Sequence, residues 1–456
     1  MKRALSRHAR GGGIQVGRKA LRPYLLKKAF QPAPATCYDS SRRKFMERRS
    51  AMVAVLIAMY FFSYYYRISP AVMAPYLAQE FSLGAERLGL LASIFFYVFA
   101  FAQFPLGPAL DSIGPRTVIS TLSAAGALGS LIFALAPSFS VCLFGRALLG
   151  LGMSCMFMGT LMVVALWYPP RLFATLAGMV SALGNTGALT AAVPLALMAE
   201  SVGWRASFLI FAAINSILAL SLWLVVRDHP IAEENGRPPV HEKYAARQAY
   251  RRILGTPSFW GIAALNFFTT GSFFSIQSLW AGTFLMDVFG LKPTEAGWLI
   301  SCLTAGFIIG SLLTGKISDR WGISRKRQAL ITLGLYLIPL LLLSIGVRQG
   351  REFLLYPVYF STGLFASGAV LLLAHLKELF PREIIGTSLT LSNFFAVMGI
   401  AVLQYLMGWL IERYPAAGGI YPAEAYRDAF FLLVAGMAVA LILYSRTREG
   451  RIGDPA

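Results

Sequence analysis

Arg67 is the residue whose surroundings most directly suggest a chemical role. It follows the tyrosines 64–66 inside an almost uncharged stretch that begins near residue 51 and continues to Ala78. Tyr60, Tyr64 and Arg67 have i, i+4, i+7 spacing, so they share one face of a helix. A guanidinium flanked by phenols suits a carboxylate or a phosphate, which it binds through forked hydrogen bonds. A cation within an apolar helix is costly unless it faces a cavity, so we expect Arg67 to face one rather than to reach the outer surface.

Further polar side chains recur at helical spacing in two later apolar stretches. Asn266, Thr270 and Gln277 fall on one helix face, and Asn393 shares a face with Gln404. Such side chains either bind a solute or hold helices together through hydrogen bonds, and both alternatives stay open. The predicted substrate-binding residues are Arg67, Tyr64, Tyr60, Asn266, Thr270, Gln277 and Asn393.

Other charged residues offer weaker candidates. Arg146 is predicted to lie two helical turns inside an apolar stretch, where it forms either part of a coupling network or a structural ion pair. His375 and Glu378 end another stretch, where either could carry a proton, although we expect a solvated helix end there. The four cysteines are scattered, without metal-ligand spacing, and the sequence has no phosphate-binding loop. The sequence therefore predicts no enzyme activity, no cofactor and no metal.

The elements that position these residues follow from composition. The chain is 57% hydrophobic and 14% charged, with a mean hydropathy of +0.62. Its apolar runs reach the 20 or so residues that a helix needs to cross a bilayer, and they are continuous rather than alternating, which argues against strands. We predict an all-α polytopic membrane protein with twelve spans, near residues 51–78, 88–110, 115–136, 139–168, 172–199, 204–226, 258–287, 294–317, 327–347, 353–378, 382–411 and 426–446.

An internal repeat divides these spans into two halves of six. The pattern G-x-x-x-D-x-x-G occurs at 107–114 and again at 315–322, shifted by 208 positions. Pro169, Thr175 and Gly187 recur with a shift of 212 positions. Since repeats fix architecture, we predict five segments: a basic, disordered tail (1–50), an N-terminal half (51–226), a cytoplasmic linker (227–257), a C-terminal half (258–446) and a C-terminal tail (447–456).

The net charge of +20 is explained by topology. With both termini in the cytoplasm, 32 of the 41 Lys and Arg residues fall on the inner side and 7 on the outer side. Nucleic acid is therefore not needed as a partner. Residues 1–50 carry 14 of the basic residues and few apolar ones. This composition fits a disordered tail, an organelle transit leader or a start at Met46.

The repeated motif falls at two predicted cytoplasmic turns, where an aspartate can face the positive N-terminal end of another helix. In this respect the chain resembles the major facilitator superfamily over roughly residues 48–448. The first copy departs from the family pattern, because Ser112 replaces the usual basic residue. The resemblance implies substrate binding near mid-membrane between two rocking halves. The residues that carry it, which we predict to control gating, are Gly107, Asp111, Gly114 and Arg116, and Gly315, Asp319, Arg320 and Gly322.

The tyrosine–arginine pair of the first span resembles that of bacterial organophosphate:phosphate antiporters. That family places a second arginine in span 7, where this chain reads Ser272 to Trp280 without one. We therefore expect a small organic anion or zwitterion, such as an organic acid, amino acid or small peptide. An organophosphate antiporter and a transporter-like receptor are the alternatives. We further expect a monomer in a bacterial inner membrane, with symport of a proton as one coupling scheme beside sodium coupling and facilitated diffusion.

Overall fold

The computed structural model describes residues 35–168, 170–228, 246–320, 324–345 and 352–449. Helices dominate these residues, which contain no strand beyond a single bridge between Ala417 and Ile420. Within these described ranges, twelve helical segments are long and apolar enough to cross a membrane, so the predicted fold class is confirmed. They are Glu47–Ile68, Ala85–Leu110, Pro115–Ala134, Phe139–Trp167, Gly178–Val202, Trp204–Val225, Pro257–Phe289, Pro293–Thr314, Arg325–Ile345, Glu352–Leu379, Ile384–Ile411 and Ala423–Ser445.

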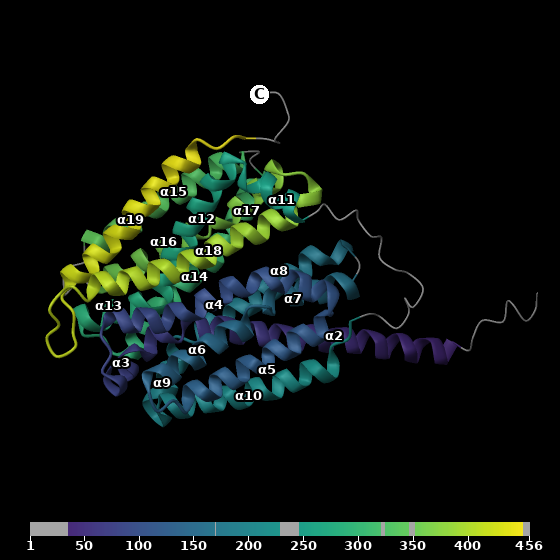
Figure 1. The fold of residues 1–456 in the computed structure, drawn as a ribbon, viewed down its shortest axis with the longest axis horizontal. Coiled ribbons are helices and arrows are strands. Elements are labelled where there is room, and N and C mark those ends of the chain that lie inside the picture. Colours follow the sequence, from purple (N-terminus) through teal and green to yellow (C-terminus); the bar gives the residue numbers. More distant parts are fainter. Residues whose placement is uncertain (1–34, 169, 229–245, 321–323, 346–351, 450–456) are drawn as a thin grey trace, which may run out of the picture. The chain divides into compact units, whose positions relative to one another are not determined.

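The helices of the first half are drawn in purple to teal in Figure 1. They are α2 (Ala35–Ile68), α3 (Pro70–Phe81), α4 (Ala85–Ser112), α5 (Pro115–Ala134), α6 (Phe139–Met153), α7 (Met156–Trp167), α8 (Pro170–Thr190), α9 (Val193–Val202) and α10 (Trp204–Val225). The chain forms two compact units, Met1–Ala51 and Met52–Ala456. The contacts described below all lie within the second unit.

The second half continues in green and yellow. A short helix, α11 (Ala246–Leu254), precedes it. Its helices are α12 (Pro257–Ser275), the π-helix η1 (Ile276–Trp280), α13 (Ala281–Phe289), α14 (Pro293–Arg320), α15 (Arg325–Ile345), the 3₁₀ turn η2 (Glu352–Leu354), α16 (Leu355–Ala366), α17 (Ala369–Leu379), α18 (Arg382–Ile411) and α19 (Ala423–Ser445).

Spans 1, 4, 7 and 10 are interrupted, at matching places in the two halves. The breaks separate α2 from α3, α6 from α7, α12 from α13 through η1, and α16 from α17. Span 5 is also divided, into α8 and α9. Non-helical backbone at membrane depth is tolerated where protein buries it or a cavity lies beside it, and interrupted helices are typical of binding sites in transporters. The interrupted spans are therefore candidates for a binding site, and Arg67 lies beside the break in span 1.

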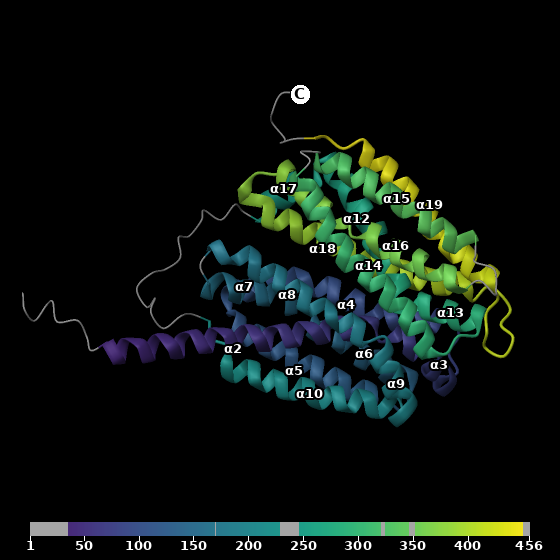
Figure 2. The same cartoon turned by 180° about the vertical axis from the view of Figure 1, so that it is seen from behind.

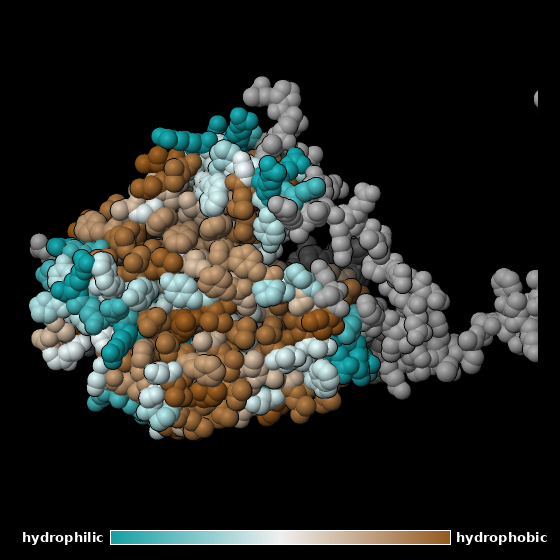
Figure 3. Space-filling model, viewed as in Figure 1, coloured by the Kyte–Doolittle hydropathy of each residue, from teal (hydrophilic) through white to brown (hydrophobic). Residues whose placement is uncertain are grey.

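The halves meet where α4 packs against α18 and where α14 packs against α8 and α9. Close approach depends on small residues: a Cβ added to Gly408 would lie 2.6 Å from the carbonyl oxygen of Ala85. At the end of the molecule where α3 and α13 lie, the two helices are side by side in both views (Figures 1 and 2). Between hydrophilic ends, the surface is largely hydrophobic (Figure 3), as expected for side chains that face lipid.

Three sequence predictions need correction. Span 1 is not continuous from 51 to 78, because α2 ends at Ile68 and Pro70 starts a new helix, a position that suits proline. Disorder does not extend over the whole tail, since α2 begins at Ala35; residues 1–34 lie outside the described residues. The linker also contains the unpredicted helix α11, whose length of 9 residues is too short for a clear periodic signal.

Candidate functional site

Arg67 lies in the last turn of α2, directly before the break in span 1. Its guanidinium carbon is 4.9 Å from the ring centre of Tyr64 and 4.6 Å from that of Phe99 on α4. Nη2 lies 3.4 Å from the hydroxyl of Ser63, and Nε is buried without a hydrogen-bond partner. Arg67 makes no ion pair with any residue that the structure describes.

These contacts fix the position of the charge without neutralising it. Contacts with aromatic faces attract a cation, but they leave most of its five N–H donors unused. A buried donor without an acceptor is costly, and a carboxylate is the acceptor whose geometry matches the guanidinium. The arrangement around Arg67 therefore leaves guanidinium N–H donors without an acceptor among the described residues.

An aromatic row extends from Arg67 into both halves. Tyr64 and Tyr60 have ring centres 5.3 Å apart, and Tyr60 stacks on Phe157 of α7 at 5.3 Å. On the other side, the ring of Tyr64 is 6.5 Å from that of Phe274 on α12, in the second half. The structure thus places the predicted residues Arg67, Tyr64 and Tyr60 together at the interface between the halves.

The ring of Tyr60 packs directly against a glycine of α8, which has no side chain to displace it. A Cβ added to Gly184 would lie 2.2 Å from Cδ1 of Tyr60, so any larger residue there must displace the ring. Gly178, six residues earlier on the same helix, has open space at the same point. The contact makes Gly184 a determinant of the Tyr60 position that the sequence analysis missed.

The amides of span 7 are engaged in helix contacts. The Nδ2 group of Asn266 donates to the hydroxyl of Ser392 at 3.1 Å, and its Oδ1 accepts from Thr270 at 2.9 Å. Gln277, in the π-helix η1, donates to the hydroxyl of Thr304 at 2.8 Å. In this conformation, these bonds fit the alternative that the amides hold helices together.

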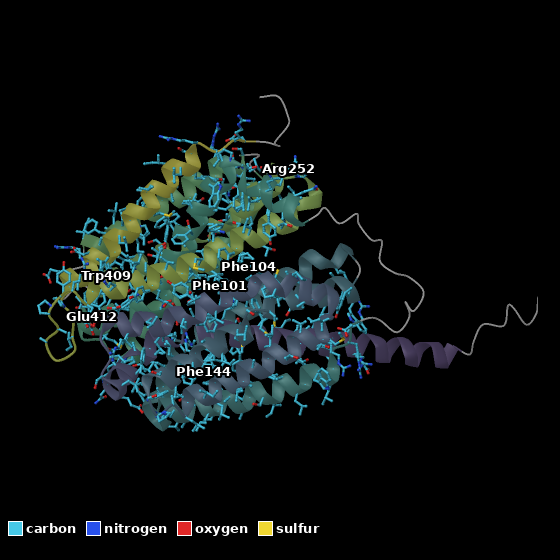
Figure 4. All side chains as sticks on the ribbon, in the orientation of Figure 1. Phe101, Phe104, Phe144, Arg252, Trp409 and Glu412 are labelled. Carbon is cyan, nitrogen blue, oxygen red and sulfur yellow. The ribbon has the colours of Figure 1, made fainter. Side chains whose placement is uncertain are left out.

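The amides of span 11 differ from each other. Gln404 donates to the hydroxyl of Ser278 at 2.9 Å, while its Oε1 is buried without a partner. Asn393 is half-buried. Its neighbour Phe394 packs on Phe104 at 4.7 Å between ring centres, and Figure 4 shows Phe104 beside Phe101 on α4. Asn393 therefore lies next to the interface between the halves.

Arg146 is enclosed within the first half. Its side chain is 1% exposed, and all three guanidinium nitrogens are buried without hydrogen-bond partners. The guanidinium lies 4.9 Å from the ring centre of Phe95, and no described residue forms the ion pair that we considered. Because it is buried, Arg146 does not contact a solute in this conformation.

The gating motifs are described only in part. Gly114 separates α4 from α5 with φ of 97°, a value that favours glycine. Arg116 donates its backbone N–H to Asp228 at 2.8 Å and its Nε to the carbonyl of Trp223 at 3.1 Å, so it joins α5 to the end of α10. A Cβ at Gly107 would meet nothing.

The remaining motif residues leave the gating role a prediction. The side chains of Asp111, Asp319 and Arg320 lie outside the described residues, as do Gly322 and the surroundings of Gly315.

A latch joins the halves at the end that bears Glu412. We use this name for Ala85 and Glu86 at the start of α4 together with Tyr405, Glu412 and Tyr421 of the second half. The N–H of Ala85 donates to the hydroxyl of Tyr421 at 3.1 Å, and that of Glu86 donates to the Glu412 carboxylate. The hydroxyl of Tyr405 donates to Oε1 of Glu86 at 2.6 Å.

The latch holds this end of the interface together. Partial burial raises the pKa of the Tyr421 hydroxyl above its ordinary value. Beside the latch lies a cavity of about 640 Å³, lined in part by Tyr421, Trp280 and Asp287. Since the bonds join the two halves, separating them at this end breaks the latch.

The aromatic residues around Arg67 were not predicted. Phe99, Phe157 and Phe274 are single aromatic residues within apolar runs, and 33 phenylalanines occur in the chain. Nothing local distinguishes these three from residues that face lipid. Only the packing of spans 2, 4 and 7 against span 1 brings them to the site.

The twelve candidate spans of the described residues, in two halves with interrupted helices beside a cation at their interface, are typical of polytopic solute transporters. Residues 56–292 and 281–455 match the Major Facilitator Superfamily, so the chain belongs to this family. It is an integral, multi-pass membrane protein and, like the family, transports small molecules by alternating access.

Individual relatives are distant but cover most of the chain. The chain is similar to the glycerol-3-phosphate transporter of Bacillus subtilis strain 168, with 25% identity over 92% of this chain and 97% of the relative. It is 22% identical to the D-galactonate transporter of Escherichia coli O6:H1 over 90% of this chain and 98% of the relative. Among solved structures, a bacterial homologue of the human lysosomal transporter Spinster superposes with a TM-score of 0.72, at 18% identity over 87% of this chain and 96% of that chain.

Proposed function

We propose that the chain is a secondary transporter of a small organic anion or zwitterion, and that Arg67 binds its carboxylate. The observation that carries the proposal is the guanidinium of Arg67, which is held between Tyr64 and Phe99 and has no acidic partner in the described part of the chain. Tyr64 also contacts Phe274 of the opposite half. A solute bound to Arg67 therefore lies where relative motion of the halves changes its access.

A single available guanidinium favours one negative charge at the bound group. Arg146, the other arginine in mid-span of the first half, is enclosed away from the interface. In the part of span 7 formed by α12 and η1, the polar residues are neutral and include Asn266 and Gln277. A carboxylate needs one forked partner, whereas a phosphate dianion would leave charge uncompensated here.

A phosphate ester is the second candidate, and one relative favours it. One relative named above is a transporter of glycerol 3-phosphate, and another is a transporter of a sugar acid. Both names denote small anions with hydroxyl groups. Tyr60 and Tyr64 offer phenols that suit such hydroxyls as well as the anionic group.

We further propose a membrane setting for this activity. The distribution of Lys and Arg supports cytoplasmic termini, which places the latch on the outer side and makes the described conformation closed to the outside. The bacterial relatives support a bacterial inner membrane. A monomer and symport with a proton remain predictions.

A paired solute screen tests the proposal. Purified protein is heated with matched pairs of compounds, each a carboxylate and its neutral amide, and with phosphate esters beside their parent alcohols. We expect stabilisation by carboxylates and none by the amides, because only a charged, forked acceptor satisfies Arg67. Compounds that stabilise the protein are then tested for uptake into proteoliposomes. Stabilisation by amides and acids alike contradicts the anion site, and binding without uptake identifies a receptor.

A further inference from the structure

A cavity of about 570 Å³ lies between the start of α12 and the residues that follow α19. Its lining includes Thr256, Trp260, Leu443, Arg446 and Arg448. We call it the basic cavity. It belongs to the second half alone and lies at the end that is predicted to be cytoplasmic, away from the latch.

The two arginines are exposed, and their backbone is held in place. The N–H of Arg448 donates to the hydroxyl of Ser258 at 3.0 Å, and its carbonyl lies 3.0 Å from Nε2 of His375. Lys326 donates to the carbonyl of Thr447 at 2.6 Å. These bonds fix the backbone of the turn that follows α19 and carries Arg446 and Arg448.

Nearby acids are engaged elsewhere. Glu449 accepts from the hydroxyl of Ser324 at 3.1 Å, and Glu378 lies 3.6 Å from Nε of Arg325. Neither Arg446 nor Arg448 forms an ion pair within the described ranges. The basic cavity therefore carries two positive charges that no described carboxylate neutralises.

The helix α11 adds charge at the same end. Its Ala249 and Ile253 are buried, at 2% and 0% exposure, whereas Arg251 and Arg252 are exposed. The carbonyl of Arg252 accepts from the Thr256 hydroxyl at 2.8 Å, which joins α11 to the edge of the basic cavity. Figure 4 shows Arg252 at this end, and Figure 3 shows hydrophilic residues over α11 and over the end of α19. A short helix with one apolar and one basic face is typical of a membrane surface.

The wall below the charges is apolar and exposed. Trp260 is 47% exposed, and Leu443 and Ile442 of α19 are 46% and 56% exposed. The indole N–H of Trp260 donates to the carbonyl of Leu254, the last residue of α11, at 2.8 Å. Tryptophan is enriched at the interface between membrane and water, so its presence here fits a lipid site. A ligand that satisfies the whole surface has an anionic head for the arginines and an acyl chain for the wall.

We propose that the basic cavity binds an anionic phospholipid, with its phosphate at Arg446 and Arg448 and an acyl chain along Leu443 and Trp260. Clusters of basic residues beside a membrane helix recognise anionic headgroups, and arginine matches phosphate through its fork. The proposal needs only that the chain spans a membrane, so it stands independently of the transported solute.

Native mass spectrometry of the full-length protein tests the site. The protein is released from detergent in an equimolar mixture of phosphatidylglycerol and phosphatidylcholine. We expect preferential retention of phosphatidylglycerol by the wild type. Each Arg near an anionic surface contributes about a five-fold factor in affinity. The double variant R446Q/R448Q should therefore bind phosphatidylglycerol about thirty-fold more weakly than the wild type.

Controls separate charge, fold and ligand source. The variant R87Q/R413Q removes the same charge at the opposite end and should retain the lipid. The variant R446K/R448K keeps the charge but loses the fork, so it should bind the lipid more weakly than the wild type and more tightly than R446Q/R448Q. Such intermediate binding shows that replacing both arginines leaves the segment folded. Equal retention by R446Q/R448Q and R87Q/R413Q overturns the proposal. Displacement of the lipid by millimolar inorganic phosphate would also overturn it, because the site would then bind free phosphate rather than lipid.

Discussion

The geometry of the latch predicts how strongly it favours conformers in which the halves are closed at this end. Glu412 accepts the N–H of Glu86 in the first turn of α4. A Cβ added to Gly84 would lie 2.6 Å from Oε1 of Glu412, so the carboxylate sits directly on the helix start. A carboxylate at an exposed helix N-terminus contributes about 0.3–1 kcal/mol. Because α4 and Glu412 belong to different halves, this free energy stabilises only conformers that are closed at this end.

The change Glu412→Gln keeps the side chain nearly the same size and removes its charge. A loss of about 1 kcal/mol corresponds to about a five-fold increase in the open-to-closed ratio at this end, since about 1.4 kcal/mol is a factor of ten. High salt should reduce the effect, because the contact is exposed. The expected result is a five-fold shift at low salt and a smaller one at high salt.

Distances between spin labels measure this ratio. Labels at Arg87 on α4 and at Arg413 next to Glu412 report the two halves at this end, after removal of the native cysteines. The control is Glu424→Gln, which removes the same charge from an exposed position in the first turn of α19. Equal distance distributions in Glu412→Gln, the control and the unmodified protein would refute the latch as a conformational contact.

Two further changes test the site and the gate. Gly184→Ala should lower uptake several-fold, because its new methyl group displaces Tyr60, whereas Gly178→Ala on the same helix meets open space and should leave uptake unchanged; equal uptake by both variants would show that the Tyr60 position is irrelevant. Asp111→Asn should increase labelling of cysteines at the predicted cytoplasmic side by up to about thirty-fold and slow turnover more than it weakens binding, because a partly buried carboxylate at a helix start is worth up to about 2 kcal/mol. Unchanged labelling in Asp111→Asn and Asp319→Asn alike would make the two motifs simple turns.

The spans could be predicted from sequence because their signal is local. A charge-free run of 20 or more residues can be recognised as a membrane helix from its own composition, without knowledge of the helices that pack against it. The breaks within spans 4 and 10 carry no such signal: Ser154 and Ser367 are ordinary residues in apolar surroundings. They depend on how helices pack, as does the π-helix of span 7.

The same distinction applies to the site. Tyr60, Tyr64 and Arg67 share a helix face by spacing alone, so their proximity could be predicted. The aromatic contacts of Arg67 with Phe99 and of Tyr64 with Phe274 join different helices, and one sequence does not show which helices meet. Asn266 illustrates the reverse case, because its spacing leaves solute binding and helix contact equally open, and only the structure shows that Ser392 accepts from its amide in this conformation.

Uptake by Arg67 variants tests the central claim most directly. The measurement is concentration-dependent uptake, into proteoliposomes, of the carboxylate that best stabilises the protein. Loss of a charged hydrogen-bond pair costs about 1.5–3 kcal/mol, so Arg67→Gln should bind the solute about ten- to a hundred-fold more weakly. Arg67→Lys should recover little, because a point charge does not reproduce the fork, while Arg87→Gln at the exposed end of α4 should transport normally. Uptake by Arg67→Gln with wild-type concentration dependence, at equal protein insertion, would contradict the account.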